Sequence, residues 1–236
     1  MVTTLTPHQR AFRSTVALKA LMALTGLILI AFLLMHCFGN LKLLISAEEF
    51  NHYAHWLKGE GDAGGMLEPL IPHGWFIWIF RVFMLAAAVL HILAAVVLWR
   101  RAYNATPSNY EARKKLAQTY AARTQRLGGV ILGALLLWHL LQFTVIPAQM
   151  AGQAGEPSSY VIFAFGQWYY VLCYAVFMGL VCLHVRHGFW SAFTTLGVNT
   201  SKRAEKVLNV LAYLIAALLF IGFMAMPLAV LGGIVS

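Results

Sequence analysis

The sequence predicts an all-α integral membrane protein in which five helices form a single bundle across residues 1–236. Of the 236 residues, 61% are hydrophobic and 11% are charged, whereas a soluble domain carries about 25% charged residues. The mean hydropathy is +0.73. Five apolar stretches are each long enough to cross about 30 Å of hydrocarbon at about 1.5 Å per helical residue. They occupy residues 17–45, 73–100, 125–149, 159–188 and 204–233.

The first stretch is expected to be a retained membrane span. Its apolar run from Ala20 to Phe38 is longer than the apolar region of a signal peptide, and no small-x-small cleavage site follows it. The connection after it, 46–72, contains five acidic residues and a glycine-rich middle, which predicts a loop. Within that connection, residues 47–57 are predicted to form a short helix lying at the membrane interface.

The second to fifth stretches lack the polar face that a soluble helix presents to water. Helices that are apolar nearly all round suit a bundle in lipid, because each helix satisfies its own backbone hydrogen bonds. The three cysteines, Cys37, Cys173 and Cys182, fall in apolar stretches without CxxC spacing. They are predicted to pack as small hydrophobic side chains rather than to bind zinc or an iron–sulfur cluster.

The basic residues predict the orientation of the bundle. Of the 17 Lys and Arg residues, 14 lie in the N-terminal arm, in the connection after the second stretch, or in the connection after the fourth. The positive-inside rule then places the N-terminus in the cytoplasm and the C-terminus outside. Because the net charge of +9 comes from clusters between apolar stretches, it indicates membrane topology, and no nucleic-acid partner is expected.

Four histidines lie inside the apolar stretches, one on each of the first four: His36, His91, His139 and His184. Ionisable side chains in hydrocarbon are costly and indicate a functional site. Counted from the predicted inner ends at about 1.5 Å per residue, His36 and His139 lie about 25 and about 20 Å deep, in the outer half. His91 lies about 13 Å from the inner end, and His184 is close to the inner face. Depth therefore pairs His36 with His139 and His91 with His184.

Each predicted pair has the composition of a bis-histidine haem site between two helices. A neutral imidazole nitrogen binds iron while its other N–H is held by a neighbouring acceptor. Two such ligands leave no open position on the iron, which favours electron transfer over oxygen binding. The sequence thus predicts two haems b stacked across the membrane. Small residues that would admit a flat macrocycle, or equally mediate helix packing, are Gly26, Gly129, Gly133 and Gly179.

Further candidate residues lie near the predicted haem levels. Arg81 lies in the second stretch, about 15 Å outward of His91, where it would meet an outer haem propionate or extend to the outer headgroups. His187, one turn from His184, would meet a propionate or lie solvated at the interface. His52, His55 and His73 are expected to be ordinary surface groups.

An electron acceptor that takes up protons would need a proton donor near the outer haem. The sequence offers four residues for this role on the outer side: Glu60, Glu68, Trp75 and Arg81. An inner site could instead use Ser14, Trp190 or Ser191. Simple surface or interfacial anchoring is the alternative role for all of them.

The order and spacing of four motifs resemble one protein family. The motifs are Leu34-Met-His36-Cys-Phe-Gly-Asn40, Val89-Leu-His91, Gln125-Arg-Leu-Gly128 leading to Trp138-His139, and His184-Val-Arg-His-Gly188-Phe-Trp-Ser191 followed by Gly197. Over nearly its whole length the chain resembles the five-helix dihaem cytochrome b membrane anchor of succinate dehydrogenases and related fumarate reductases. Each motif is short, and their specificity comes from being found together.

The resemblance implies a heterotrimeric respiratory complex II in the bacterial cytoplasmic membrane. A flavoprotein subunit would oxidise succinate, and an iron–sulfur subunit would pass the electrons on, both docked on the basic cytoplasmic face. The inner haem would receive the electrons, the outer haem would follow, and a quinone, in this family often menaquinone, would be reduced. For an outer quinone site the candidate residues are Glu60, Glu68, Trp75 and Arg81. This chain would be the quinone-reducing electron-transfer subunit and would carry no succinate chemistry of its own. A higher oligomer of the complex is also compatible with the resemblance.

One departure from the family bears on the direction of the reaction. Some dihaem fumarate reductases have a glutamate two residues before the last haem ligand, and here that position is Cys182. None of the eight acids falls in the interior of a predicted span, which favours succinate oxidation. The alternatives are the anchor of a fumarate reductase, of another quinone-linked dehydrogenase or hydrogenase, and a transporter that relays protons through histidines. Transporters tend to show internal repeats and broken helices, which this sequence lacks.

Overall fold

The computed structural model describes residues 14–60, 64–105, 118–145 and 155–235, with the side chains of 118–124 left out. In this part of the chain the regular structure is helical. Five helices are long and apolar enough to cross a membrane, as expected of a multi-pass membrane protein. They are α2 (Thr15–Leu41), α4 (Trp75–Asn104), α5 (Gln118–Leu140), α8 (Trp168–Thr195) and α9 (Lys202–Leu231).

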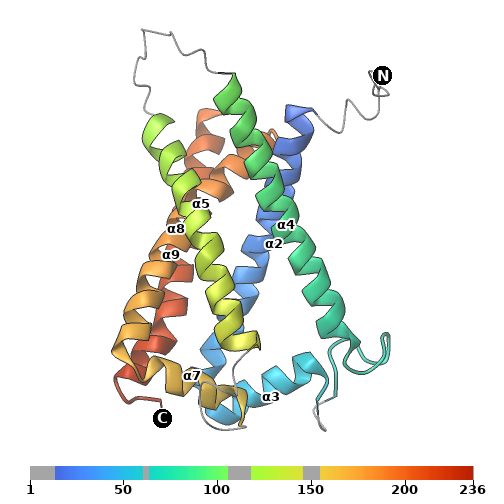
Figure 1. Ribbon diagram of the computed structural model, residues 1–236, viewed down its shortest axis with the longest axis vertical. Helices are drawn as coiled ribbons and strands as arrows, with labels where there is room; N and C mark the ends of the chain where they lie inside the picture. Colours follow the sequence, from blue (N-terminus) through green and yellow to red (C-terminus); the bar gives the residue numbers. More distant parts are fainter. Residues whose placement is uncertain (1–13, 61–63, 106–117, 146–154, 236) are drawn as a thin grey trace.

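The five long helices run between two ends of the molecule (Figure 1). α2 and α9 begin at the same end, which is the upper end of Figure 1. Two shorter helices, α3 (Ala47–Lys58) and α7 (Pro157–Phe165), lie across the opposite end. The first turn past α2 is a 3-10 segment, Lys42–Leu44, and a π-helical segment, Leu141–Val145, follows α5.

Serine caps begin three of these helices. The hydroxyl of Ser14 accepts a hydrogen bond from the backbone N–H of Ala17, Ser46 does the same for Glu49, and Ser201 for Ala204. Each satisfies one of the N–H groups that a helix start leaves unpaired. α3 ends at Gly59, whose left-handed backbone (φ 65°, ψ 53°) is readily adopted only by glycine. The predicted interfacial helix therefore has defined ends.

The fourth predicted span differs most from the structure. The range 159–188 was expected to be one helix, but the chain forms α7 and then a separate α8 that begins at Trp168. The break is at Gly166 and Gln167, where Gln167 has an extended backbone (φ −101°, ψ 119°). α7 instead packs on α3, and the backbone N–H of Ser158 donates to Asn51 Oδ1 at 2.9 Å. Residues 146–149 of the third predicted span lie outside the described residues.

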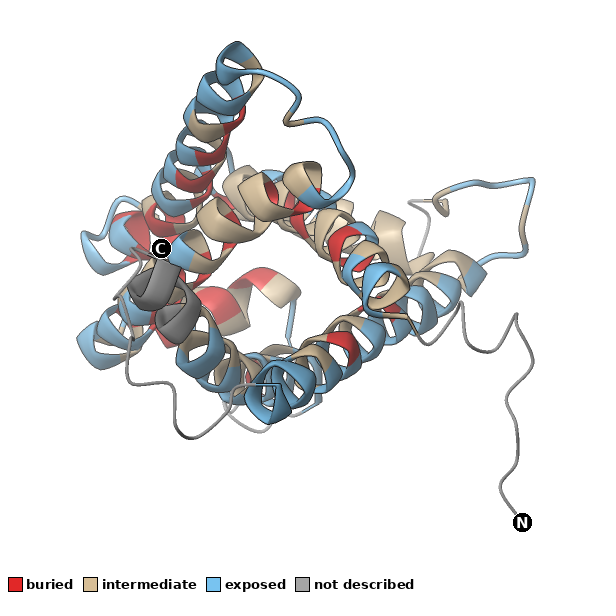
Figure 2. Cartoon of the chain, turned by 90° about the horizontal axis from the view of Figure 1, so that it is seen from above, coloured by how far each residue is buried: buried red, intermediate tan, exposed pale blue. Residues whose placement is uncertain are grey.

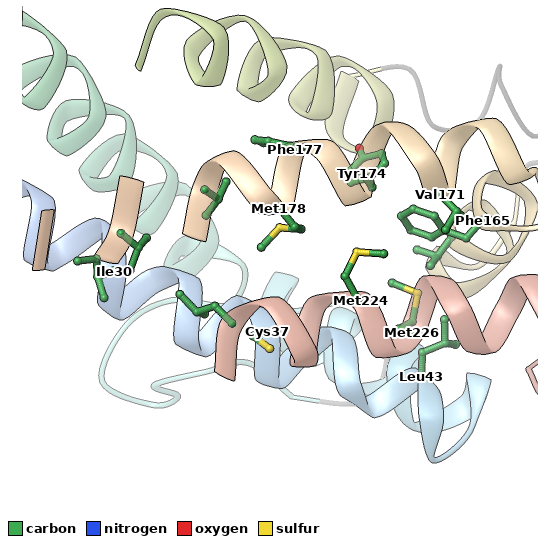
Figure 3. Close-up of a cluster of buried hydrophobic side chains, with 14 of the residues drawn as sticks. Ile30, Cys37, Leu43, Phe165, Val171, Tyr174, Phe177, Met178, Met224 and Met226 are labelled. Atoms are coloured by element: carbon green, nitrogen blue, oxygen red, sulfur yellow. The ribbon is translucent and has the colours of Figure 1, made fainter. Parts of the chain in front are cut away.

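Viewed end-on, the helices of the bundle are arranged in a ring (Figure 2). α8 packs along α9 and α2, α4 packs along α2, and α5 packs along α8. The buried core is concentrated between α2, α8 and α9, where Cys37, Tyr174 and Met224 are among its members (Figure 3). α4 and α5 bury little of their surface and expose large apolar side chains such as Trp78 and Leu137. Such surfaces suit lipid rather than water.

Candidate two-level histidine site

The four membrane histidines meet as two pairs, each joining two helices. The ring centroids of His36 on α2 and His139 on α5 are 5.9 Å apart, with the ring planes at 80°. Those of His91 on α4 and His184 on α8 are 6.3 Å apart, with the planes at 69°. These are the two pairings that depth predicts from the sequence.

The two pairs lie at different levels of the bundle. His36 is five residues before the end of α2, and His139 is one residue before the end of α5, so this pair is close to α3 and α7. We call it the outer pair and the other the inner pair, after the orientation that the sequence predicts. His91 contacts Thr25 of α2, which lies eleven residues before His36 on the same helix. Eleven residues make about three helical turns, so the levels differ by about 16 Å along one face of α2.

The imidazole ring of His91, in the inner pair, is held through its Nδ1 atom. Its N–H donates to the carbonyl oxygen of Met22 at 3.1 Å and to the hydroxyl oxygen of Thr25 at 3.2 Å. The Thr25 hydroxyl donates its own hydrogen to the carbonyl of Leu21 at 2.7 Å, so its oxygen acts as an acceptor toward His91. Gly26 lies beside the ring, and a Cβ there would come 3.2 Å from His91 Cε1. α2 therefore positions His91 and leaves its Nε2 for another partner.

His184 completes the inner pair from α8. The side-chain amide of Gln125 on α5 donates to its carbonyl oxygen at 3.3 Å, which ties α5 to α8 at this level. The Nδ1 atom of His184 is buried and has no hydrogen-bond partner among the described residues. A buried polar atom without a partner is uncommon in folded proteins, and a water or an ion is one way to satisfy it.

The outer pair is held by aromatic rings and by a short polar chain. His36 stacks on Phe32, with ring centroids 5.3 Å apart and planes at 18°, and it also contacts Phe223 at 5.6 Å. Nδ1 of His139 lies 3.1 Å from the hydroxyl oxygen of Tyr174. That hydroxyl in turn donates to Gln142 Oε1 at 3.0 Å. Tyr174 and Gln142 are 7% and 5% exposed, so this chain is shielded from solvent.

The geometry of both pairs fits a haem iron bound from two sides. Two imidazoles on one iron, with metal–nitrogen bonds of about 2 Å, place their ring centroids about 6 Å apart. An acceptor on Nδ1 is usual for a metal-binding histidine, and one member of each pair, His91 and His139, has such a contact. The described residues contain no cluster of three or more His, Cys, Asp or Glu side chains that could hold a metal ion. Two ligands are too few for a structural zinc site, whereas haem needs only axial ligands from the protein.

The structure gives Arg81 and His187 less specific surroundings. Arg81 is exposed, and its guanidinium lies 5.0 Å from the ring centroid of Trp78 on the same helix. This cation–π contact at the outer part of α4 matches the headgroup alternative at least as well as a propionate contact. His187 is half-buried one turn from His184, and the pairing gives it no defined role.

The structure gives the four outer quinone candidates different surroundings. Glu60 contacts His55 and Lys58, whereas Glu68 contacts His73 and the backbone N–H of Gly65. The remaining two, Trp75 and Arg81, are exposed on α4. Of the inner candidates, Ser14 is used as the N-cap of α2, and Trp190 has a buried Nε1 without a partner in the described part.

The structure instead places an open polar cavity of about 610 Å³ beside α3. Its lining residues are Glu48, Glu49, Asn51, His52, His55 and Glu156. His55 was expected to be an ordinary surface group, but its ring bridges two carboxylates. Nε2 lies 2.7 Å from Glu156 Oε2 and Nδ1 lies 3.0 Å from Glu60 Oε2. The hydrogen bond with Glu156 raises the pKa of His55 above its ordinary 6.5, and Glu60 adds to this effect. Partial desolvation acts in the opposite direction but does not cancel it.

Several supporting residues were missed by sequence reasoning. Thr25, Gln142 and Tyr174 are polar groups inside apolar spans, which is itself a signal of function or of a satisfied hydrogen bond. Their partners lie on other helical segments, so the sequence does not show them. Comparison of the chain with protein-family models, curated proteins and solved structures finds no match. A function for this chain therefore has to be inferred from its own residues.

Proposed function

We propose that this chain is the dihaem cytochrome b membrane anchor of a succinate:quinone oxidoreductase. The single observation that supports this most is the presence of two imidazole pairs, at 5.9 and 6.3 Å, on two levels of one membrane bundle. A lone membrane histidine is readily explained as a packing residue. Two pairs with the spacing of axial ligands are not.

In this proposal haem, when bound, supplies a one-electron iron centre at each level. His91 and His184 hold the inner group, and His36 and His139 hold the outer one. Met22 and Thr25 keep the Nδ1–H of His91 occupied, so Nε2 stays available to iron. The apolar spans keep water away from both levels, and burial of this kind is one of the means by which a protein sets a haem potential.

The two ends of the bundle suit different partners. At the end where α2 and α9 begin, Lys19, Lys202, Arg203 and Lys206 provide positive charge for the flavoprotein and iron–sulfur subunits on the cytoplasmic side. At the other end, α3 and the loop after it carry carboxylates next to histidines. Glu60 with His55 and Glu68 with His73 are hydrogen-bonded pairs that can pass protons to a quinone reduced near the outer haem. Menaquinone is the quinone we propose.

A reduced-minus-oxidised visible spectrum of the purified chain tests the haem proposal directly. We expect b-type bands and two haems per chain. His91→Ala and His184→Ala should remove the same haem, and His36→Ala and His139→Ala should remove the other. His52→Ala, on the exposed face of α3, is the matched control and should retain both. A wild-type chain without b-type bands would refute the proposal and would favour the transporter alternative.

Copurification tests the identity of the complex. The anchor of a succinate dehydrogenase should purify with a flavoprotein and an iron–sulfur subunit, and the complex should reduce quinone with electrons from succinate. If the two haems are present but the attached subunits oxidise hydrogen or formate instead, the electron-transfer role stands and the assignment to complex II is wrong.

A further inference from the structure

The outer pair is held by a polar chain of side chains from three helical segments. It runs from His139 at the end of α5, through the Tyr174 hydroxyl on α8, to the side-chain amide of Gln142 in the π-helical segment. The Nδ1-to-oxygen distance is 3.1 Å and the oxygen-to-oxygen distance is 3.0 Å. Gln142 is three residues past His139, so both side chains reach the Tyr174 hydroxyl on α8. π-helical segments inside helices are frequent at functional sites.

In the order that the structure shows, each hydrogen between His139, Tyr174 and Gln142 Oε1 has an acceptor, whereas Gln142 Nε2 is buried without a partner among the described residues. Tyr174 has one hydrogen, which it gives to Gln142 Oε1, so its oxygen receives the N–H of His139 Nδ1. His139 is then the tautomer whose Nε2 carries a free lone pair. If the Gln142 amide were turned over, its NH₂ would face the tyrosine, and the hydroxyl hydrogen could satisfy only Nδ1. The Nε2 atom would then carry the proton, and iron could bind only after that proton moved to Nδ1 and the hydrogen bond with Tyr174 reversed.

We infer that Tyr174 and Gln142 are positioning residues that set the tautomer and the electron-donating strength of His139, and thereby the potential of the outer haem alone. This inference rests on the proposed function. An acceptor on Nδ1–H raises the basicity of a metal-binding imidazole and stabilises the oxidised metal. Because the chain is buried and its bonds are coupled, removing its far end weakens the near bond as well.

The inner pair provides a built-in reference. His91 Nδ1 is held by the Met22 carbonyl and the Thr25 hydroxyl on α2, about 16 Å along that helix from the outer level. A change in the polar chain should therefore alter one of two haem signals in the same sample, which general damage to the bundle would not do.

The test is a potentiometric titration of the intact complex in membranes, together with the electron paramagnetic resonance of each low-spin ferric haem. Tyr174→Phe should keep both haems and raise the midpoint potential of one. At a fixed ambient potential we expect about a tenfold smaller ratio of ferric to ferrous outer haem, which is about 59 mV for a one-electron couple. Its resonance should also change, because the imidazole is freed to rotate.

Gln142→Leu leaves the tyrosine in place and should shift the same haem in the same direction by a smaller factor. Tyr170→Phe is the matched control. Tyr170 lies one turn from Tyr174 on α8 and stacks on Trp138, with ring centroids 6.1 Å apart. The His139 ring instead has its hydrogen bond with Tyr174, so substitution of Tyr170 should leave both potentials as they are.

The outcomes separate this inference from the proposed function. A wild-type complex without haem refutes both. A wild-type complex with two haems refutes this inference alone if Tyr174→Phe behaves like Tyr170→Phe or moves both potentials equally. If the Tyr174→Phe variant loses the outer haem, the Gln142→Leu variant decides. A rise in the midpoint potential of its outer haem alone supports the inference, whereas an unchanged potential or the loss of both haems overturns it.

Discussion

Gly222 of α9 packs so closely on Cys37 of α2 that a single methyl group should not fit. A Cβ built on Gly222 would lie 2.4 Å from Cys37 Sγ, whereas non-bonded heavy atoms prefer about 3.5–4.0 Å. Cys37 is 3% exposed and lies in the core between α2, α8 and α9, so its sulfur has little room to move. Gly222→Ala must therefore either force the thiol off its rotamer or push the two helices apart.

The expected cost of Gly222→Ala is about 1–3 kcal/mol of unfolding free energy, the usual cost of overpacking a well-packed core. Cys37→Ala alone should cost about 1 kcal/mol, because it removes one buried heavy atom. In the double variant the methyl group added at position 222 occupies space that the sulfur has left. The packed volume is nearly conserved, and the stability should return to within about 1.5 kcal/mol of the wild type.

Unfolding of the purified chain in mixed detergent micelles, followed by circular dichroism for all four proteins, measures this cycle. The double variant should be more stable than Gly222→Ala, with a coupling energy of about 1–3 kcal/mol. Gly179→Ala is the matched control, because Gly179 has open space at Cβ and a helical backbone, whereas Gly233 is unsuitable at φ 70°. Additive costs would refute the reasoning, since they would mean that the two residues do not share the space.

Two further predictions concern the inner pair and the outer surface. Gly26→Ala should selectively shift or weaken the inner haem signal, because its Cβ would come 3.2 Å from His91 Cε1. Gly128→Ala, with nothing within 4 Å of its Cβ, is the control, and equal effects would contradict the assignment. The His55–Glu156 contact should stabilise the outer end by about 0.2–1 kcal/mol below pH 6.5 and lose that effect as pH rises through the raised pKa of His55. Thermal unfolding of wild type and His55→Gln across about pH 5–9 measures it, and a constant difference between them would count against the contact.

The positions of the spans and the pairing of the histidines were accessible from the sequence for the same reason. Hydropathy is a local property, and depth follows from counting residues along a helix from a charged end. His36 and His139, for example, could be matched without knowing how α2 and α5 pack. The haem proposal thus began with the sequence, and the geometry of the two ring pairs added the spacing that supports it.

The division of the fourth predicted span could not be anticipated in the same way. Residues 157–165 are as apolar as the helix that follows, so composition does not distinguish them from a membrane span. What separates α7 is its packing on α3, including the hydrogen bond from Ser158 to Asn51, which lies 107 positions earlier in the chain. The partners of two quinone candidates could not be anticipated either, because Glu60 and Glu68 each form a hydrogen bond with a histidine five residues away.

By itself the sequence determined that this protein is a membrane bundle of five apolar helices with imidazoles at two depths, because those properties depend only on residue type and position along a helix. The tertiary structure alone decided which atoms face each imidazole. Tyr174 reaches His139, and Thr25 reaches His91, only through the rotation of one helix relative to another. That rotation results from packing among many side chains, such as Cys37 against Gly222, and no local pattern encodes it.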